Sequence, residues 1–85
     1  MPEAIAALRR AVELAPDDPD QAYVLAIALH DTGDPAGAIA VLAAAHQRRP
    51  ARADLLSALV QFNAEVGDRE AAERWQQQLR ALGAP

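Results

Sequence analysis

The 85-residue sequence contains no cysteine and no lysine, and it has only one tryptophan, one tyrosine and one phenylalanine. Without cysteine there is no disulfide framework and no thiolate metal site. All eight basic residues are arginines in short clusters, against twelve acidic residues and a formal net charge of −4. An acidic chain without a basic stripe argues against nucleic-acid binding. No apolar run approaches membrane-spanning length and no segment resembles a signal peptide, so we expect no membrane insertion and, by default, a cytoplasmic location. For a longer parent protein the location stays open.

What the sequence does contain is a period of 34 residues. A shift by this length places Pro16 on Pro50, Leu25 on Leu59, and the Gly33-Asp34 pair on a second Gly-Asp pair at 67–68. A fixed period of this size marks stacked structural repeats. We therefore divide the chain into a partial repeat at residues 1–16, a full repeat at 17–50 and a C-terminal repeat at 51–85.

Helical spacing of apolar residues predicts five helices, near residues 2–15, 19–32, 35–48, 52–66 and 69–82. Asp18-Pro19 and Asp34-Pro35 each place a capping residue before a proline at the first helical position. The acidic cluster around Asp18 is for this reason interpreted as a helix start and not as a cation site. Gly33 suits the left-handed residue that follows a helix. The predicted fold class is all-α, with short connections between antiparallel helices.

Residues 17–50 resemble a tetratricopeptide repeat (TPR), whose pattern is W-x2-L-G-x2-Y, then A-x3-F, then P. The places of this pattern are occupied, in order, by Ala22, Leu25, Ala26, Leu29, Ala38, Leu42 and Pro50. The Trp, Gly and Tyr of the pattern are replaced by small or apolar residues. The resemblance implies a right-handed α-solenoid of about two and a half repeats. Because about three repeats are needed for stability, we expect a fragment of a larger protein, with a complete short protein as the alternative.

No catalytic or cofactor-binding pattern is present. His30 and His46 lie on different predicted helices without a partner at metal-ligand spacing, so both are interpreted as exposed helical histidines. Ser57 lacks the turn of a nucleophile elbow, and there is no glycine-rich phosphate loop. We expect no enzymatic activity, no cofactor and no metal site in this segment.

The TPR resemblance implies that helices 19–32 and 52–66 line a concave groove that holds a peptide or a partner helix. The predicted groove residues are Asp20, Tyr23, Val24, Ile27, Asp31, Asp54, Ser57, Ala58, Gln61 and Glu65. Tyr23 is the best candidate for an anchor, because it combines a large apolar area with a polar tip. Ordinary core packing is the alternative for Tyr23, Val24 and Ile27. The four acidic residues favour a neutral or basic partner.

The two ends of the chain differ. Ile5, Leu8 and Val12 form an apolar stripe without its own partner helix, which predicts a homodimer of the isolated chain through this helix. Gln76-Gln77-Gln78 gives the other end a polar surface, as a terminal repeat requires. Three functions remain open: a protein-interaction scaffold, a structural spacer or self-association segment, and an accessory domain of an enzyme.

Overall fold

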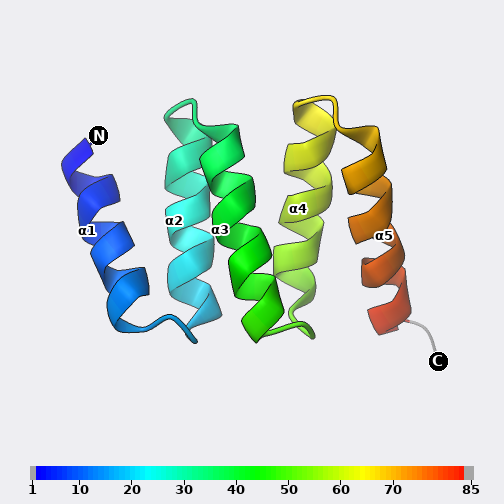
Figure 1. Cartoon of the computed structure of the whole chain (residues 1–85), viewed down its shortest axis with the longest axis horizontal. Coiled ribbons are helices and arrows are strands. Elements are labelled where there is room, and N and C mark those ends of the chain that lie inside the picture. Colours follow the sequence, from blue (N-terminus) through cyan, green and yellow to red (C-terminus); the bar gives the residue numbers. More distant parts are fainter. Residues whose placement is uncertain (1, 84–85) are drawn as a thin grey trace.

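The computed structural model describes residues 2–83 and consists of five helices joined by short turns (Figure 1). They are α1 (Pro2–Leu14), α2 (Pro19–Asp31), α3 (Pro35–Arg48), α4 (Ala53–Glu65) and α5 (Arg69–Gly83). Residues 2–83 contain no strand. The predicted all-α class is therefore confirmed, and every helix boundary lies within one residue of its predicted position.

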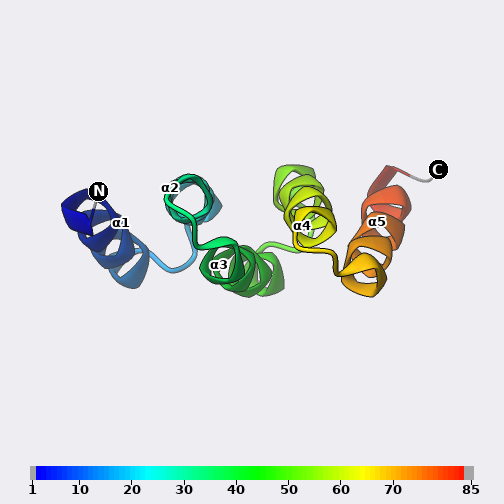
Figure 2. The same ribbon diagram turned by 90° about the horizontal axis from the view of Figure 1, so that it is seen from above.

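The helices form a single row in which consecutive helices run antiparallel (Figure 1). Each helix packs against the next one in the sequence, from α1 on α2 to α4 on α5. Seen from above, α2 and α4 lie on one side of the row and α3 lies on the other (Figure 2). The Cα atoms span 41 × 27 × 13 Å, so the molecule is a thin slab with two broad faces.

The turns that follow α2 and α4 have the same backbone structure. After α2, the Asp34 N–H donates to the Leu29 carbonyl at 2.8 Å and the Gly33 N–H donates to the His30 carbonyl at 3.2 Å. These two bonds define a Schellman motif, which needs a left-handed residue at its centre. Gly33 supplies it with φ = 90°, and Gly67 has φ = 83° in an identical pair of bonds one period later.

Aspartates begin three of the helices. The Asp18 carboxylate accepts hydrogen bonds from the Asp20 and Gln21 amides at 3.0 and 3.4 Å, which caps α2 as predicted. The Asp34 carboxylate accepts a hydrogen bond from the Gly37 amide at the start of α3, and the Asp68 carboxylate accepts one from the Ala71 amide at the start of α5. Such caps satisfy amides that have no partner inside the helix.

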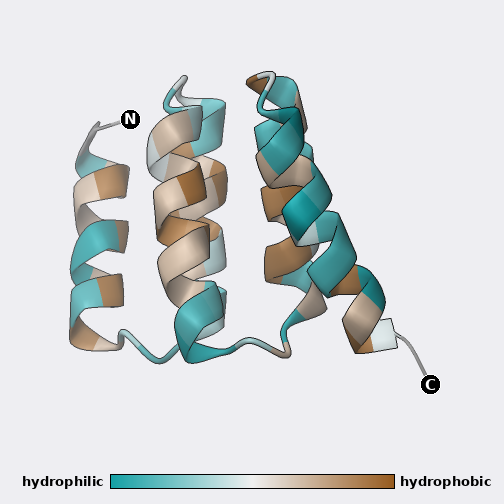
Figure 3. Ribbon diagram, turned by 45° about the vertical axis from the view of Figure 1, so that its right-hand side comes forward, coloured by the Kyte–Doolittle hydropathy of each residue, from teal (hydrophilic) through white to brown (hydrophobic). Residues whose placement is uncertain are grey.

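Buried leucines and alanines form one continuous core between the helices. The largest fully buried side chains are Leu25, Leu42, Leu55, Leu56 and Leu59. Leu25 is 2% exposed and Leu59 is 0% exposed, so the two leucines that the 34-residue period relates are both buried. Burial of a leucine side chain is worth about 1.5–3 kcal/mol. Hydrophobic residues lie between the helices, whereas the outer surface of α5 is largely hydrophilic (Figure 3).

The terminal helices join this core through half-buried residues. Ile5, Leu8 and Val12 of α1 pack against it, as do Trp75 and Leu79 of α5. Within residues 2–83, no helix combines the length and the apolar character needed to span a bilayer.

Candidate interaction face of helices α2 and α4

The predicted groove residues occupy the two helices that share one side of the row (Figure 2). We call this surface the α2–α4 face and define it by its exposed and half-buried members. The exposed members are Asp20, Val24, Asp31, Asp54, Ser57, Gln61 and Glu65, and the half-buried members are Tyr23 and Ile27. The face therefore keeps nine of the ten residues predicted from the sequence.

Val24 is the most accessible apolar residue of this face. Its side chain is 51% exposed, whereas Tyr23 and Ile27 are half-buried and pack against the core. The core alternative is thus correct in part for Tyr23 and Ile27, and it is wrong for Val24. Any apolar contact on this face would centre on Val24.

Ala58 does not belong to the face, and its prediction as a groove residue was wrong. It is 5% exposed and belongs to the core. Helix α4 packs against both α3 and α5, and Ala58 lies on a side of α4 that this packing covers, whereas Ala53 and Ala64 of the same helix are exposed. Ser57 and Gln61 lie on the solvent side of the same helix and are exposed.

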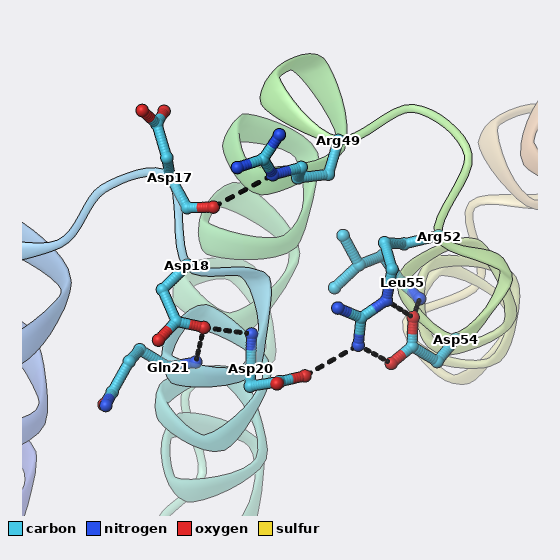
Figure 4. Close-up of polar contacts among 8 residues, drawn as sticks. All are labelled: Asp17, Asp18, Asp20, Gln21, Arg49, Arg52, Asp54 and Leu55. Atoms are coloured by element: carbon cyan, nitrogen blue, oxygen red, sulfur yellow. Dashed lines mark hydrogen bonds and ion pairs between the residues drawn. The ribbon is translucent and has the colours of Figure 1, made fainter.

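At the start of α2 and α4, Arg52 joins the two helices (Figure 4). Its Nη2 lies 2.7 Å from Asp20 Oδ1 and 2.7 Å from Asp54 Oδ2, and its Nε donates to Asp54 Oδ1 at 3.0 Å. The two-pronged contact with Asp54 is the geometry that arginine and a carboxylate prefer. The hydrogen bonds from Arg52 hold the pKa of Asp54 below its ordinary value.

Arg52 is the N-cap residue of α4, the position that Asp18 holds in α2 one repeat earlier. Asp18 caps α2, but Arg52 makes no side-chain cap for α4. Instead, the Asp54 carboxylate accepts a hydrogen bond from the Leu55 amide at 3.0 Å (Figure 4). Where Asp18 makes a local cap, Arg52 therefore makes a contact between repeats.

Two further arginines connect the end of α3 to the turn before α2. Arg48 Nη1 lies 2.8 Å from Asp17 Oδ1, and Arg49 Nε donates to the Asp17 carbonyl at 3.0 Å. The Arg49 contact is drawn in Figure 4. Exposed pairs of this kind contribute little stability each. Both arginines contact Asp17, which is outside the α2–α4 face, so neither pairs with a carboxylate of the face.

At the opposite end of α2 and α4, His30 makes the corresponding connection. Its Nε2 lies 3.1 Å from Glu65 Oε1, and its Nδ1 lies 3.5 Å from Asp31 Oδ1. Its ring stacks on Phe62, with centroids 4.2 Å apart. The hydrogen bond with Glu65, reinforced by Asp31, raises the pKa of His30 above 6.5.

Neither histidine is the exposed residue that the sequence analysis predicted. His30 is half-buried against Phe62, and His46 is half-buried with its ring edge-on to Trp75 at a centroid distance of 5.1 Å. Sequence spacing could not reveal these contacts, because the partner of each histidine lies about 30 residues away on another helix. The only available signal was the period itself, which relates Asp31 to Glu65.

At each end of the face, two carboxylates one period apart contact the same basic side chain. Asp20 and Asp54 are 34 residues apart and share Arg52, while Asp31 and Glu65 are 34 residues apart and share His30. The four carboxylates and one guanidinium leave a net charge of −3 when His30 is neutral and −2 when it is protonated. The face is acidic, but less so than its four carboxylates alone suggest.

Within residues 2–83 there is no group of three or more His, Cys, Asp or Glu residues that could hold a metal ion. The arrangement offers a surface with charged ends and an apolar centre. No protein-family model matches the sequence, and the comparison with curated proteins finds no match.

Proposed function

We propose that the chain is a protein-interaction module of the TPR type, in which two and a half helical repeats stack as an α-solenoid. Support comes from the 34-residue period of the sequence and from the backbone hydrogen bonds that recur at the same period around Gly33 and Gly67. The alternating positions of α2 and α4 on one side of the row agree with this arrangement (Figure 2). The proposed ligand is a peptide or a helix of a partner protein, held on the α2–α4 face.

The observation that carries this proposal is the exposure of Val24 between two charged ends. A valine that is 51% exposed in the middle of a regular helix contributes little to the core. Interfaces typically have an apolar centre and a polar rim that remains accessible to solvent. The Arg52 and His30 clusters provide such a rim at either end of α2.

The charge of the face favours a neutral or basic partner segment. With Arg52 and His30 taken into account, the surface keeps a net negative charge. Complementary charge increases the rate of association and discourages partners of the same sign.

Titration of the chain against pools of basic, neutral and acidic peptides tests the proposal. We expect the basic pool to bind best, with an affinity that falls as salt is added. Val24→Arg should weaken this binding at least about tenfold, because it removes the apolar centre and adds like charge. Leu14→Arg is the matched control, since Leu14 is 80% exposed on α1 and lies outside the face.

Preference for the acidic pool, or equal losses in Val24→Arg and Leu14→Arg, would count against the α2–α4 face as the binding site. Failure of every pool to bind would favour a structural spacer. Half-burial of Tyr23 and Ile27 is the observation that supports this second candidate, because it leaves less apolar area than an open groove requires. The homodimer through α1 stays a prediction. Its stripe is half-buried against the core, and sedimentation over a dilution series would test it.

A further inference from the structure

A hollow of about 380 Å³ opens between α1, α2 and α3. Its lining includes Ala22, Ala45, Val12 and Val41, together with the exposed Glu13 and Arg48. Both alanines are buried and both valines are half-buried. A closed apolar cavity of about 150 Å³ already accommodates benzene, so this hollow has room for a bicyclic aromatic ring.

The internal repeat explains why the hollow exists. One period later, the places of Val12, Ala22 and Val41 are taken by His46, Leu56 and Trp75. Leu56 is fully buried, and the rings of His46 and Trp75 meet edge to face at 5.1 Å. The layer formed by α3, α4 and α5 therefore carries large side chains where the layer of α1, α2 and α3 carries alanine and valine.

We propose that this hollow binds the tryptophan side chain of a partner protein segment. The fold already holds a tryptophan ring of its own, Trp75 of α5, at the equivalent place in the next layer, where it packs edge to face against His46 of α3. In the first layer that place is empty of large side chains and lined by apolar ones. A tryptophan ring of a partner would fill the hollow in the first layer, as the ring of Trp75 fills the equivalent place in the second.

Charge at the edge of the hollow agrees with this ligand. Arg48 is neutralised by Asp17, with Nη1 and Oδ1 2.8 Å apart, whereas Glu13 forms no ion pair with any other part of the chain that the structure describes. Its carboxylate is available to accept a hydrogen bond from the indole N–H, which is a donor only. A basic residue beside the tryptophan would meet the same carboxylate.

The hollow and the α2–α4 face are separate surfaces. Ala22 and Val24 are two residues apart on α2, which turns their side chains about 200° from each other around the helix axis. Ala22 is buried and lines the hollow, whereas Val24 is exposed on the face. The tryptophan site therefore does not depend on the function proposed for the face, and each can fail without the other.

The test uses N-acetyl-tryptophanamide as the probe, with N-acetyl-leucinamide as the non-aromatic control. The 15N-labelled chain is titrated and its amide resonances are followed by NMR. We expect saturable shifts centred on Val12, Ala22 and Ala45, with a dissociation constant on the order of millimolar, because a fragment-sized ligand gains little binding energy. The leucine compound should bind at least about tenfold more weakly, since it lacks the planar ring that fills the hollow.

Two variants place the large side chains of the second layer at the equivalent positions of the first. Ala22→Leu introduces the counterpart of Leu56, and Val41→Trp introduces the counterpart of Trp75. Each should fold, raise the melting temperature and reduce probe binding at least about tenfold by filling the hollow. Gln77→Trp, which adds a tryptophan at an exposed position on α5, is the matched control and should leave binding unchanged.

The proposal is overturned if the probe causes no saturable shifts, or if the shifts lie away from the hollow. Equal binding of the leucine compound, or undiminished binding to whichever filled variant folds, would overturn it as well. A gain in stability from both substitutions without any probe binding to the unmodified chain would identify the hollow as a packing defect alone.

Discussion

The imidazole ring of His30 lies flat on the phenyl ring of Phe62, with centroids 4.2 Å apart and an angle of 8° between the planes. Phe62 is 3% exposed and belongs to the core of α4, so the stacking fixes a titratable group of α2 on a rigid surface. In that position the ring nitrogens face the carboxylates of Glu65 and Asp31. A contact between repeats is thereby made sensitive to pH.

We predict that acidification from about pH 8 to pH 6 stabilises the contact between α2 and α4. The pKa of folded His30 is raised above 6.5, so the folded state binds the proton more tightly than the unfolded state does. The resulting stabilisation is complete below the unfolded pKa of about 6.5 and is lost as the pH rises through the folded pKa. Urea unfolding at a series of pH values would measure it.

Glu65→Gln is the control for this prediction. It removes the carboxylate that is mainly responsible for the raised pKa, so an NMR titration should show a lower pKa for His30 than in the unmodified chain. A pKa at or below 6.5 in the unmodified chain would contradict the assigned geometry.

Leu25→Ala should lower the free energy of unfolding by about 2–5 kcal/mol, because it leaves a cavity in the centre of the core. Leu25 is 2% exposed. Leu14→Ala makes the same chemical change at a side chain that is 80% exposed, and it should alter stability by less than about 0.5 kcal/mol. Denaturant unfolding of the two variants provides the comparison. A cost below about 0.5 kcal/mol for Leu25→Ala would mean that the core is not packed as described.

Substitution by alanine should have opposite effects on stability at two glycines, Gly37 and Gly33. At Gly37 an added Cβ would come too close to the Asp34 carboxylate, which would have to shift. Ala71 in the equivalent place carries its Cβ while its amide still donates to Asp68 at 3.1 Å, so a cap of this kind accommodates alanine. Gly37→Ala should therefore stabilise the chain by about 0.5–1 kcal/mol through helix propensity.

Gly33→Ala should destabilise the chain by about 1–2 kcal/mol, because Gly33 has φ = 90° and a side chain is strained in that conformation. Chemical unfolding of both variants under identical conditions measures the difference. A change of the same sign in the two variants would show that backbone conformation does not control these positions.

Arg52→Gln should increase the affinity of the α2–α4 face for basic peptides by about two- to fivefold at low salt. The substitution releases the Asp20 and Asp54 carboxylates from the guanidinium that joins them. Arg48→Gln releases Asp17, which lies outside the face, and should leave the affinity unchanged. Isothermal titration with one basic peptide would measure both. A gain that is equal in the two variants would reflect net charge and not the face.

The sequence by itself determined the helices and their limits. Asp18 and Asp34 cap helices with contacts over two or three residues, and Gly33 ends α2 through hydrogen bonds over three to five residues. Such interactions depend on neighbouring residues alone, so the pattern of residues is enough to predict them. The burial of Leu25 and Leu59 followed from the same periodicity, since helical spacing defines the face that packs.

Only the tertiary structure decided which side chains meet across helices. Arg52 reaches Asp20 and His30 reaches Glu65 because α2 and α4 lie at a particular distance and rotation, neither of which a pattern of residue types specifies. Ala58 failed as a predicted groove residue for the same reason, since its exposure depends on the neighbours of α4. The hollow at Ala22 likewise depends on how closely α1 and α3 approach α2, because packing distance is set by side chains that are distant in sequence.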